Sequence, residues 1–242
     1  MNFYFLNPWL WGAYMNTNIM IYLMIAMIVP MIAQGYLTSI MNTYKNKGNS
    51  TNLTGYDVAR RMLDANGLRH VQVEETNSRL SNHYDLRAKA VRLSPEVYHK
   101  PSVAAVAIAA HEVGHALQHA QNYGPLNLQG ALMPTARIAS RFSYAIIVIG
   151  LLLQMFVVAQ IGMIMIAAVF IFQLVALPVE FNASARALTQ LNEMNILYDH
   201  QEKRGIRKVL TAAALTYLAA LIVALMEFLR WAAILNGRGR RR

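Results

Sequence analysis

Long apolar stretches divide the chain and predict a helical membrane protein. Residues 19–41 hold no charged side chain. At about 1.5 Å of rise per residue, a helix of this length crosses a hydrocarbon core of ~30 Å. One transmembrane helix is therefore predicted within 1–44. Three aromatic residues before it predict a belt at the membrane interface: Trp9, Trp11 and Tyr14.

Two later apolar stretches complete the predicted membrane part. Residues 142–179 hold no charge and are about twice as long as the roughly 20 residues of one crossing. This stretch predicts a helical hairpin that turns near 160–162. Residues 209–242 hold a fourth apolar helix and a basic tail. We therefore expect about four transmembrane helices, with extramembrane segments at 45–141 and 180–208.

The polar segment 45–141 begins with a predicted helix. Thr54 and Asp57 have the spacing of a capping box, with Asp in place of the usual Glu. An amphipathic run follows, and Gly67 is placed to end it.

The same segment continues with two short strands and a second long helix. Alternating apolar residues at 71–73 and 88–93 predict a strand pair, joined as a hairpin by the polar stretch 76–85. An Ala-rich helix is predicted over 102–121. The expected fold class is α+β and mainly α-helical, with a zincin-like extramembrane domain that contains a short strand pair.

The composition supports the membrane prediction and limits the chemistry. Hydrophobic residues make up 56% of the chain and charged residues 14%, which is too apolar for an ordinary soluble domain. Cysteine is absent, so a metal site must use His, Asp or Glu. The net charge of +10 is not arranged as a nucleic-acid-binding motif, so nucleic acid is not an expected partner. The arginines of the C-terminal tail are expected to meet anionic lipid head groups or to be a solvated terminus.

The second long helix contains an HExxH motif at residues 111–115. The four-residue spacing places His111 and His115 on one face, where both imidazoles can bind one Zn²⁺. Glu112 stands beside them and is expected to accept a proton from the attacking water. The small apolar residues before the motif predict a buried helix, where His and Glu need partners. The alternative is a chance match in a structural helix.

A catalytic zinc ion usually has three protein ligands, so one more is expected. Glu180 is the best candidate because it directly follows the charge-free stretch, where an unpaired carboxylate is costly and a metal would offset the cost. The alternative is an acid at the membrane edge that extends to the interface or pairs with Arg186. His119 extends the motif's face by another turn, but three successive turns spread too far to meet one ion. We expect it to be a bystander.

His83 and Tyr84 lie in the predicted loop between the strands. A neutral imidazole or a tyrosine hydroxyl can stabilise the negative charge that develops when water attacks a carbonyl, so both are candidate catalytic residues. Simple exposure is the equally weighted alternative. Asp85, next to them, is a candidate for orienting an imidazole.

Two segments of the chain resemble the YugP-type membrane zinc metallopeptidases. They are Ala110-His111-Glu112-Val113-Gly114-His115-Ala116 and Leu177-Pro178-Val179-Glu180-Phe181-Asn182-Ala183-Ser184. The resemblance extends from about residue 53 to residue 229. It implies a zinc peptidase and supplies no substrate. More distantly, the pairing of HExxH with a later Glu is similar to gluzincin peptidases such as HtpX. Their later motif reads Glu-x-x-Ala-Asp, whereas Ser184 stands here in place of that Asp. Ser184, Asn182 and Asp85 are the candidates to replace its supporting role.

The sequence therefore predicts a zinc-dependent endopeptidase in the cell membrane that cleaves membrane-associated polypeptides. The ligands are His111, His115 and Glu180, and Glu112 is the proton acceptor. A zinc-binding scaffold without turnover and, more weakly, a transporter are the alternatives. Bases near the predicted span ends favour a cytoplasmic catalytic face. They are Lys45, Lys47, Arg137, Arg141, Arg186, Lys203, Arg204, Arg207 and Lys208.

Overall fold

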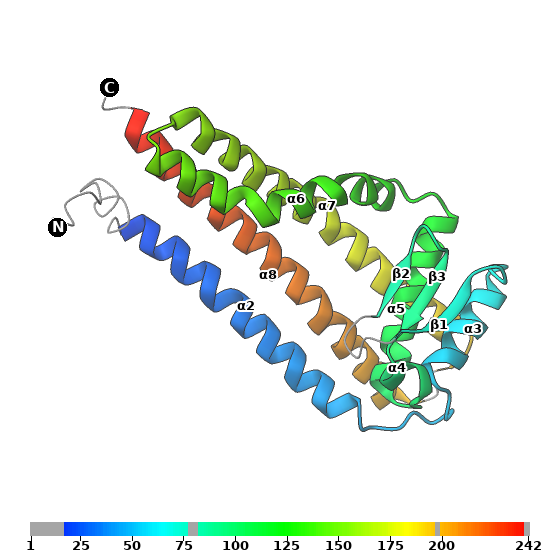
Figure 1. The fold of residues 1–242 in the computed structure, drawn as a ribbon. Coiled ribbons are helices and arrows are strands. Elements are labelled where there is room, and N and C mark those ends of the chain that lie inside the picture. The colour runs from blue at the N-terminus through cyan, green and yellow to red at the C-terminus, as the bar shows by residue number, and fades with distance from the viewer. Residues whose placement is uncertain (1–16, 77–81, 197–198, 240–242) are drawn as a thin grey trace. The chain divides into compact units, whose positions relative to one another are not determined.

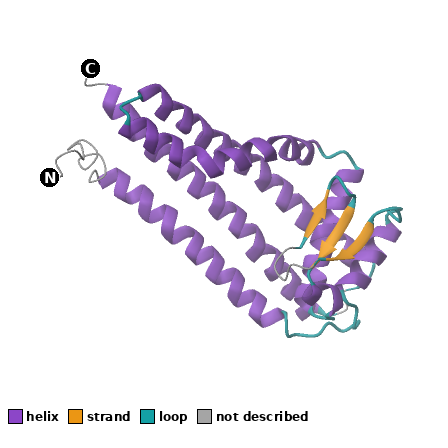
Figure 2. Cartoon of the chain, in the orientation of Figure 1, coloured by secondary structure: helices purple, strands orange, loops and turns teal. Residues whose placement is uncertain are grey.

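The computed structural model describes residues 17–76, 82–196 and 199–239. The predicted aromatic belt and the arginines at 240–242 lie outside the described residues. Figure 1 and Figure 2 show a mainly helical chain with one small sheet. Its elements, in order, are α2 (Thr17–Tyr44), α3 (Gly55–Ala65), β1 (Gln72–Glu75), β2 (His83–Asp85), β3 (Ala90–Leu93), α4 (Pro95–His99), α5 (Val103–Ala120), α6 (Gly124–Leu152), α7 (Phe156–Glu193) and α8 (His200–Gly239).

The chain folds into two compact units. One consists of Met1–Ile32, Gln129–Val175 and Leu218–Arg242, and the other of Ala33–Leu128 and Ala176–Tyr217. We call them the helical unit and the mixed unit, because the sheet lies entirely in the second. Four described helices are long and apolar enough to cross a membrane, which confirms the predicted number: Ile19–Tyr44, Gly124–Leu152, Phe156–Glu193 and His200–Leu235.

The turn between α6 and α7 lies at 153–155, so the prediction of a turn near 160–162 was wrong. Gly162 belongs to α7 and serves close helix packing instead. A Cβ added at Gly162 would lie 2.9 Å from the carbonyl oxygen of Ser143 and 3.0 Å from the backbone nitrogen of Ile147, both on α6. The glycine therefore lets two helices approach closely within the helical unit.

The surface of the helical unit is strongly apolar. Met31 on α2 is 72% exposed and Val157 on α7 is 68% exposed. Large apolar side chains in water are unfavourable over so wide an area, whereas hydrocarbon solvates them. Such a surface is typical of helices that lie in a membrane. On α8, Glu227 and Arg230 form an ion pair. The helix continues past both residues to Gly239.

The mixed unit contains a three-stranded sheet in the order β1-β3-β2. β1 pairs with β3 in parallel and β2 pairs with β3 antiparallel. The predicted hairpin between the first and last of these strands was therefore wrong: the chain crosses from β1, forms β2 within the polar stretch, and then returns as β3. β2 is an edge strand, since no other described strand pairs with its outer side.

The helices of the mixed unit begin as the sequence predicts. Thr54 and Asp57 form the capping box of α3, with Thr54 N donating to Asp57 Oδ2 at 3.0 Å and Asp57 N donating to Thr54 Oγ1 at 3.2 Å. Ser102 Oγ accepts from Ala105 N at 3.1 Å at the start of α5. The apolar side of α5 packs into the core of the unit, where Val103, Val106 and Val113 are buried.

Candidate metal centre

The HExxH helix and α7 touch at the backbone of the mixed unit. Gly114, inside the motif, packs against Ala183 of α7. A Cβ at Gly114 would overlap the carbonyl oxygen of Ala183 and lie 3.0 Å from its carbonyl carbon. Only glycine has room there, and the close approach brings the side chains of α5 and α7 within reach of one another.

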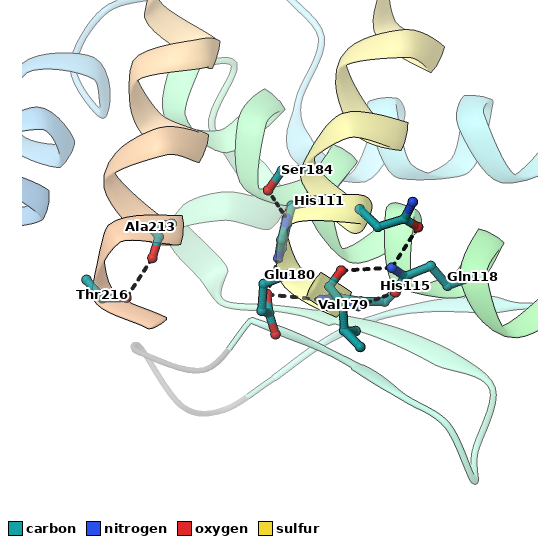
Figure 3. A network of polar contacts seen from close by, with 9 residues as sticks. His111, His115, Gln118, Val179, Glu180, Ser184, Ala213 and Thr216 are labelled. Atoms are coloured by element: carbon teal, nitrogen blue, oxygen red, sulfur yellow. Dashed lines mark hydrogen bonds and ion pairs between the residues drawn. The ribbon is translucent and has the colours of Figure 1, made fainter. Parts of the chain in front are cut away.

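Three potential metal ligands converge at this contact. Glu180 Oε2 lies 3.1 Å from His111 Nε2 and 3.5 Å from His115 Nε2. The three side chains offer ligand atoms that all lie within 4.8 Å of one another. A tetrahedral zinc ion with bonds of about 2.0–2.1 Å has ligand atoms roughly 3.3 Å apart. The two measured separations fall on either side of that value, so these residues fit zinc. Figure 3 shows Glu180 facing both imidazoles.

The electrostatics of the group favour a bound cation. Burial by itself lowers the pKa of His115, but the hydrogen bond to Glu180 and the charges of Glu112 and Glu180 outweigh burial and raise this pKa above its ordinary value. Glu112 and Glu180 are both buried. Two buried carboxylates beside two imidazoles stabilise positive charge, and a divalent ion supplies that charge.

Each imidazole also has a polar neighbour at its other nitrogen. His111 Nδ1 lies 3.1 Å from Ser184 Oγ, and His115 Nδ1 lies 3.0 Å from Gln118 Oε1. Such neighbours hold metal-binding imidazoles in orientation. Ser184 is thus the one of the three candidates that contacts a histidine of the motif, and its role in place of the Asp in the gluzincin motif stays a prediction. Gln118 was missed from the sequence, although an amide in an otherwise apolar stretch of the buried helix was an available signal.

Arg186 bonds to side-chain amides near the two histidines and not to Glu180. Its Nε donates to Asn182 Oδ1 at 2.6 Å, and its Nη1 donates to Gln121 Oε1. Among the described residues the ion-pair partners of Glu180 are the two histidines, so the alternative pairing of Glu180 with Arg186 does not form.

Tyr84 and His119 lie together near the motif. Tyr84 is on β2 and its hydroxyl oxygen lies 2.9 Å from His119 Nδ1 on α5. The stretch that holds Tyr84 is a strand and not the predicted loop. Burial and then the charge of Asp85 raise the pKa of Tyr84 above its ordinary value, so the hydroxyl stays protonated. His119 is outside the group of potential metal ligands.

The neighbours of Tyr84 in sequence face away from it. Successive side chains of a strand point to opposite faces, so His83 and Asp85 lie on the face opposite Tyr84. The carboxylate of Asp85 accepts from Ala88 N and Arg87 N at 2.9 Å each and from Arg92 Nη1 at 2.6 Å. These bonds, that from Ala88 foremost, lower the pKa of Asp85. Its partners lie in the sheet and its turn, and none of them is an imidazole. The structure does not bring His83 to the metal group, and its catalytic role stays a prediction.

A helical membrane chain that joins an HExxH helix to a carboxylate on a second helix has the architecture of a membrane zinc peptidase. Comparison with known proteins agrees. The chain belongs to the family described as "Putative neutral zinc metallopeptidase", whose sequence profile matches residues 19–236. It is 43% identical to the "Putative membrane protease YugP" of Bacillus subtilis (strain 168) over 207 residues, which cover 85% of this chain and 92% of that protein. No solved structure matches it. Zinc is the cofactor that the family and the ligand group together indicate.

Proposed function

We propose that the chain is a zinc-dependent endopeptidase that hydrolyses peptide bonds of membrane-associated polypeptides. The observation that carries the proposal is the convergence of His111, His115 and Glu180 within 4.8 Å, with Glu112 buried beside them. A purely structural zinc site has no use for a carboxylate next to the ligands. When bound, zinc supplies a Lewis acid that lowers the pKa of a water molecule to about 7 and polarises the scissile carbonyl.

The protein residues then divide the remaining work. His111, His115 and Glu180 hold the ion, and Ser184 and Gln118 orient the imidazoles. Glu112 accepts the proton of the attacking water and returns it to the leaving amine. In this proposal Tyr84 donates a hydrogen bond to the carbonyl oxygen as negative charge develops there. In the tautomer of His119 that carries its hydrogen on Nδ1, this nitrogen donates to the Tyr84 oxygen and leaves the hydroxyl hydrogen of Tyr84 available for this purpose.

The free edge of β2 favours the proposal that the substrate is a polypeptide. An extended chain can add to an exposed strand by main-chain hydrogen bonds, and side-chain pockets then set specificity. Tyr84 is the central residue of β2, so a substrate held along this edge runs past its hydroxyl. Glu180 lies on α7, a helix long and apolar enough to cross a membrane, which favours substrates that are themselves at the membrane.

The Glu112→Gln variant tests the proposal. We expect it to keep zinc, because all three ligands remain, and to lose proteolysis, because the proton acceptor is gone. Both measurements use the purified full chain. Elemental analysis gives the zinc content, and a transmembrane reporter protein that carries a casein segment gives the cleavage rate. Undiminished cleavage by Glu112→Gln would refute Glu112 as the proton acceptor. Zinc binding without any cleavage by the wild type would favour the zinc-binding scaffold.

We further propose that the catalytic face is cytoplasmic, because bases gather near the predicted span ends on its side. The chain has no cysteine, so single cysteines report sidedness directly. Asn46, an exposed residue after α2, and Asn236 near the C-terminus suit this purpose. With an impermeant thiol reagent on intact cells, we expect labelling at Asn236→Cys and protection at Asn46→Cys. The reverse pattern overturns the orientation, and labelling of both overturns the four-span topology.

A further inference from the structure

We infer that Gln118 is a positioning residue that fixes the tautomer of His115 and thereby decides which imidazole nitrogen is free to bind metal. The inference rests on the proposed zinc site. Gln118 is fully buried on α5, one turn after His115, and its amide makes hydrogen bonds in three directions. A neutral imidazole has two tautomers, and only a nitrogen without a proton can bind a metal.

The first constraint on Gln118 comes from Arg186. A guanidinium can only donate, so the atom of Asn182 that faces Arg186 Nε at 2.6 Å must be the amide oxygen. The same oxygen lies 3.0 Å from the side-chain amide of Gln118. An oxygen there can only accept, so Gln118 must present its NH₂ group.

The second constraint comes from the backbone and gives the same answer. The side-chain amide nitrogen of Gln118 lies 2.8 Å from the carbonyl oxygen of Val179, which has no proton to give. Both acceptors on α7 therefore require the NH₂ group of Gln118. Its oxygen must face the other way, toward His115 (Figure 3).

The consequence for His115 follows directly. Gln118 Oε1 lies 3.0 Å from His115 Nδ1 and can only accept, so Nδ1 carries the proton. In the neutral ring Nε2 then holds the lone pair. Nε2 is the nitrogen that faces Glu180, at 3.5 Å from Oε2. Arg186, through Asn182, and the carbonyl of Val179 thus orient the amide of Gln118, and this amide sets His115 in its metal-binding tautomer.

His111 has no such constraint. Its Nδ1 lies 3.1 Å from Ser184 Oγ, and a hydroxyl can either donate or accept. Ser184 therefore holds the position of the ring without choosing its tautomer. The two histidines of the motif are therefore supported differently.

Two variants of Gln118 separate positioning from packing. Gln118→Met keeps the length and apolar fit but offers His115 no acceptor of comparable strength. Gln118→Glu keeps an oxygen facing His115 and, when protonated, a donor for Val179. We expect Gln118→Met to weaken zinc binding by about 10–100-fold and Gln118→Glu by less than about threefold, the former being the usual cost of losing such a support. If Gln118 only fills space, the ranking reverses, because a buried acid is then the worse replacement.

The readout is the zinc dissociation constant of the purified full chain, measured by competition with a chromophoric chelator. The visible spectrum of the Co²⁺-substituted protein reports the ligand geometry. Gln190→Met is the matched control, since Gln190 lies on α7 and bonds Asn66 and Glu193 outside the metal group. We expect its dissociation constant and Co²⁺ spectrum to equal those of the wild type.

The inference about Gln118 is overturned if Gln118→Met binds zinc as tightly as the wild type, or more tightly than Gln118→Glu does. Either result leaves the proposed zinc site standing. A wild-type chain that binds no zinc would refute the proposed site itself. If Gln118→Met does not fold, Gln118→Glu decides: a dissociation constant within about threefold of wild type supports positioning, and a loss of about tenfold or more contradicts it.

Discussion

Replacing Gly114 by alanine tests whether the contact between α5 and α7 builds the metal centre. The added Cβ would overlap the carbonyl oxygen of Ala183 and lie 3.0 Å from its carbonyl carbon and 3.2 Å from its Cα. All three are backbone atoms, so no rotamer change relieves the clash. Ordinary contact distances of about 3.5–4.0 Å require the helices to separate by on the order of 0.5–1 Å.

The magnitude follows from two opposing effects. Overpacking against backbone belongs at the upper end of the usual range, about 3 kcal/mol. Alanine is the better helix former and returns about 1 kcal/mol. The net strain is therefore about 2 kcal/mol. A separation of the helices moves Glu180 away from His111 and His115, whereas zinc tolerates only about 0.2 Å of error in its bonds. If the strain falls on the metal geometry, zinc affinity drops about thirtyfold.

The assay compares Gly114→Ala with Gly124→Ala. Gly124 is the first residue of α6, and a Cβ there meets no atom within 4 Å. Both variants make the same chemical change, so their difference isolates the helix contact. We would measure the zinc dissociation constant and the thermal unfolding of the zinc-free chain. The reasoning fails if Gly114→Ala matches Gly124→Ala in both measurements.

Three further predictions concern the metal ligands, the stabilisation by zinc and Tyr84. Glu180→Ala should lower zinc occupancy more than His119→Ala, because the first removes a proposed ligand and the second a residue outside the ligand group; metal analysis of both variants checks this, and the opposite ranking would make His119 the third ligand. Zinc at about 100 times its dissociation constant should stabilise the wild type by about 2.7 kcal/mol and Glu180→Ala much less, as thermal unfolding would show. Tyr84→Phe should lower the turnover number by the same factor across about pH 6 to 9, since the raised pKa keeps the hydroxyl protonated throughout. A loss that disappears at the alkaline end of the pH profile would mean that the phenol titrates and would contradict this assignment.

The features that the sequence predicted well are those encoded by local patterns. The capping box at Thr54, the helix start at Ser102 and the four apolar helices all depend on residues close together in the chain. The approach of Glu180 to the HExxH motif was also predictable, because an acid after a long apolar stretch needs a partner.

The features that failed depend on partners far away in the sequence. In a parallel pair and in a hairpin alike, apolar side chains recur at every second residue. The pattern could therefore not reveal that β1 and β3 run in parallel. The charge-free stretch contained no signal for its turn, and Gly162, which suggested one, is used for packing. Gln118 is recognisable as a support only when Val179 and Asn182 are seen beside it.

The arrangement of polar side chains on α7 limits which changes of length the chain can accept. Glu180 and Ser184 are four residues apart and both reach His111, while Asn182 and Arg186 are four apart and connect to Gln118. Inserting or deleting one residue between them turns everything downstream by about 100° and shifts it by about 1.5 Å. Such a change would separate Ser184 from His111, and it would also break the connection from Arg186 to Gln118, which supports His115. This helix can therefore vary in residue type more readily than in length.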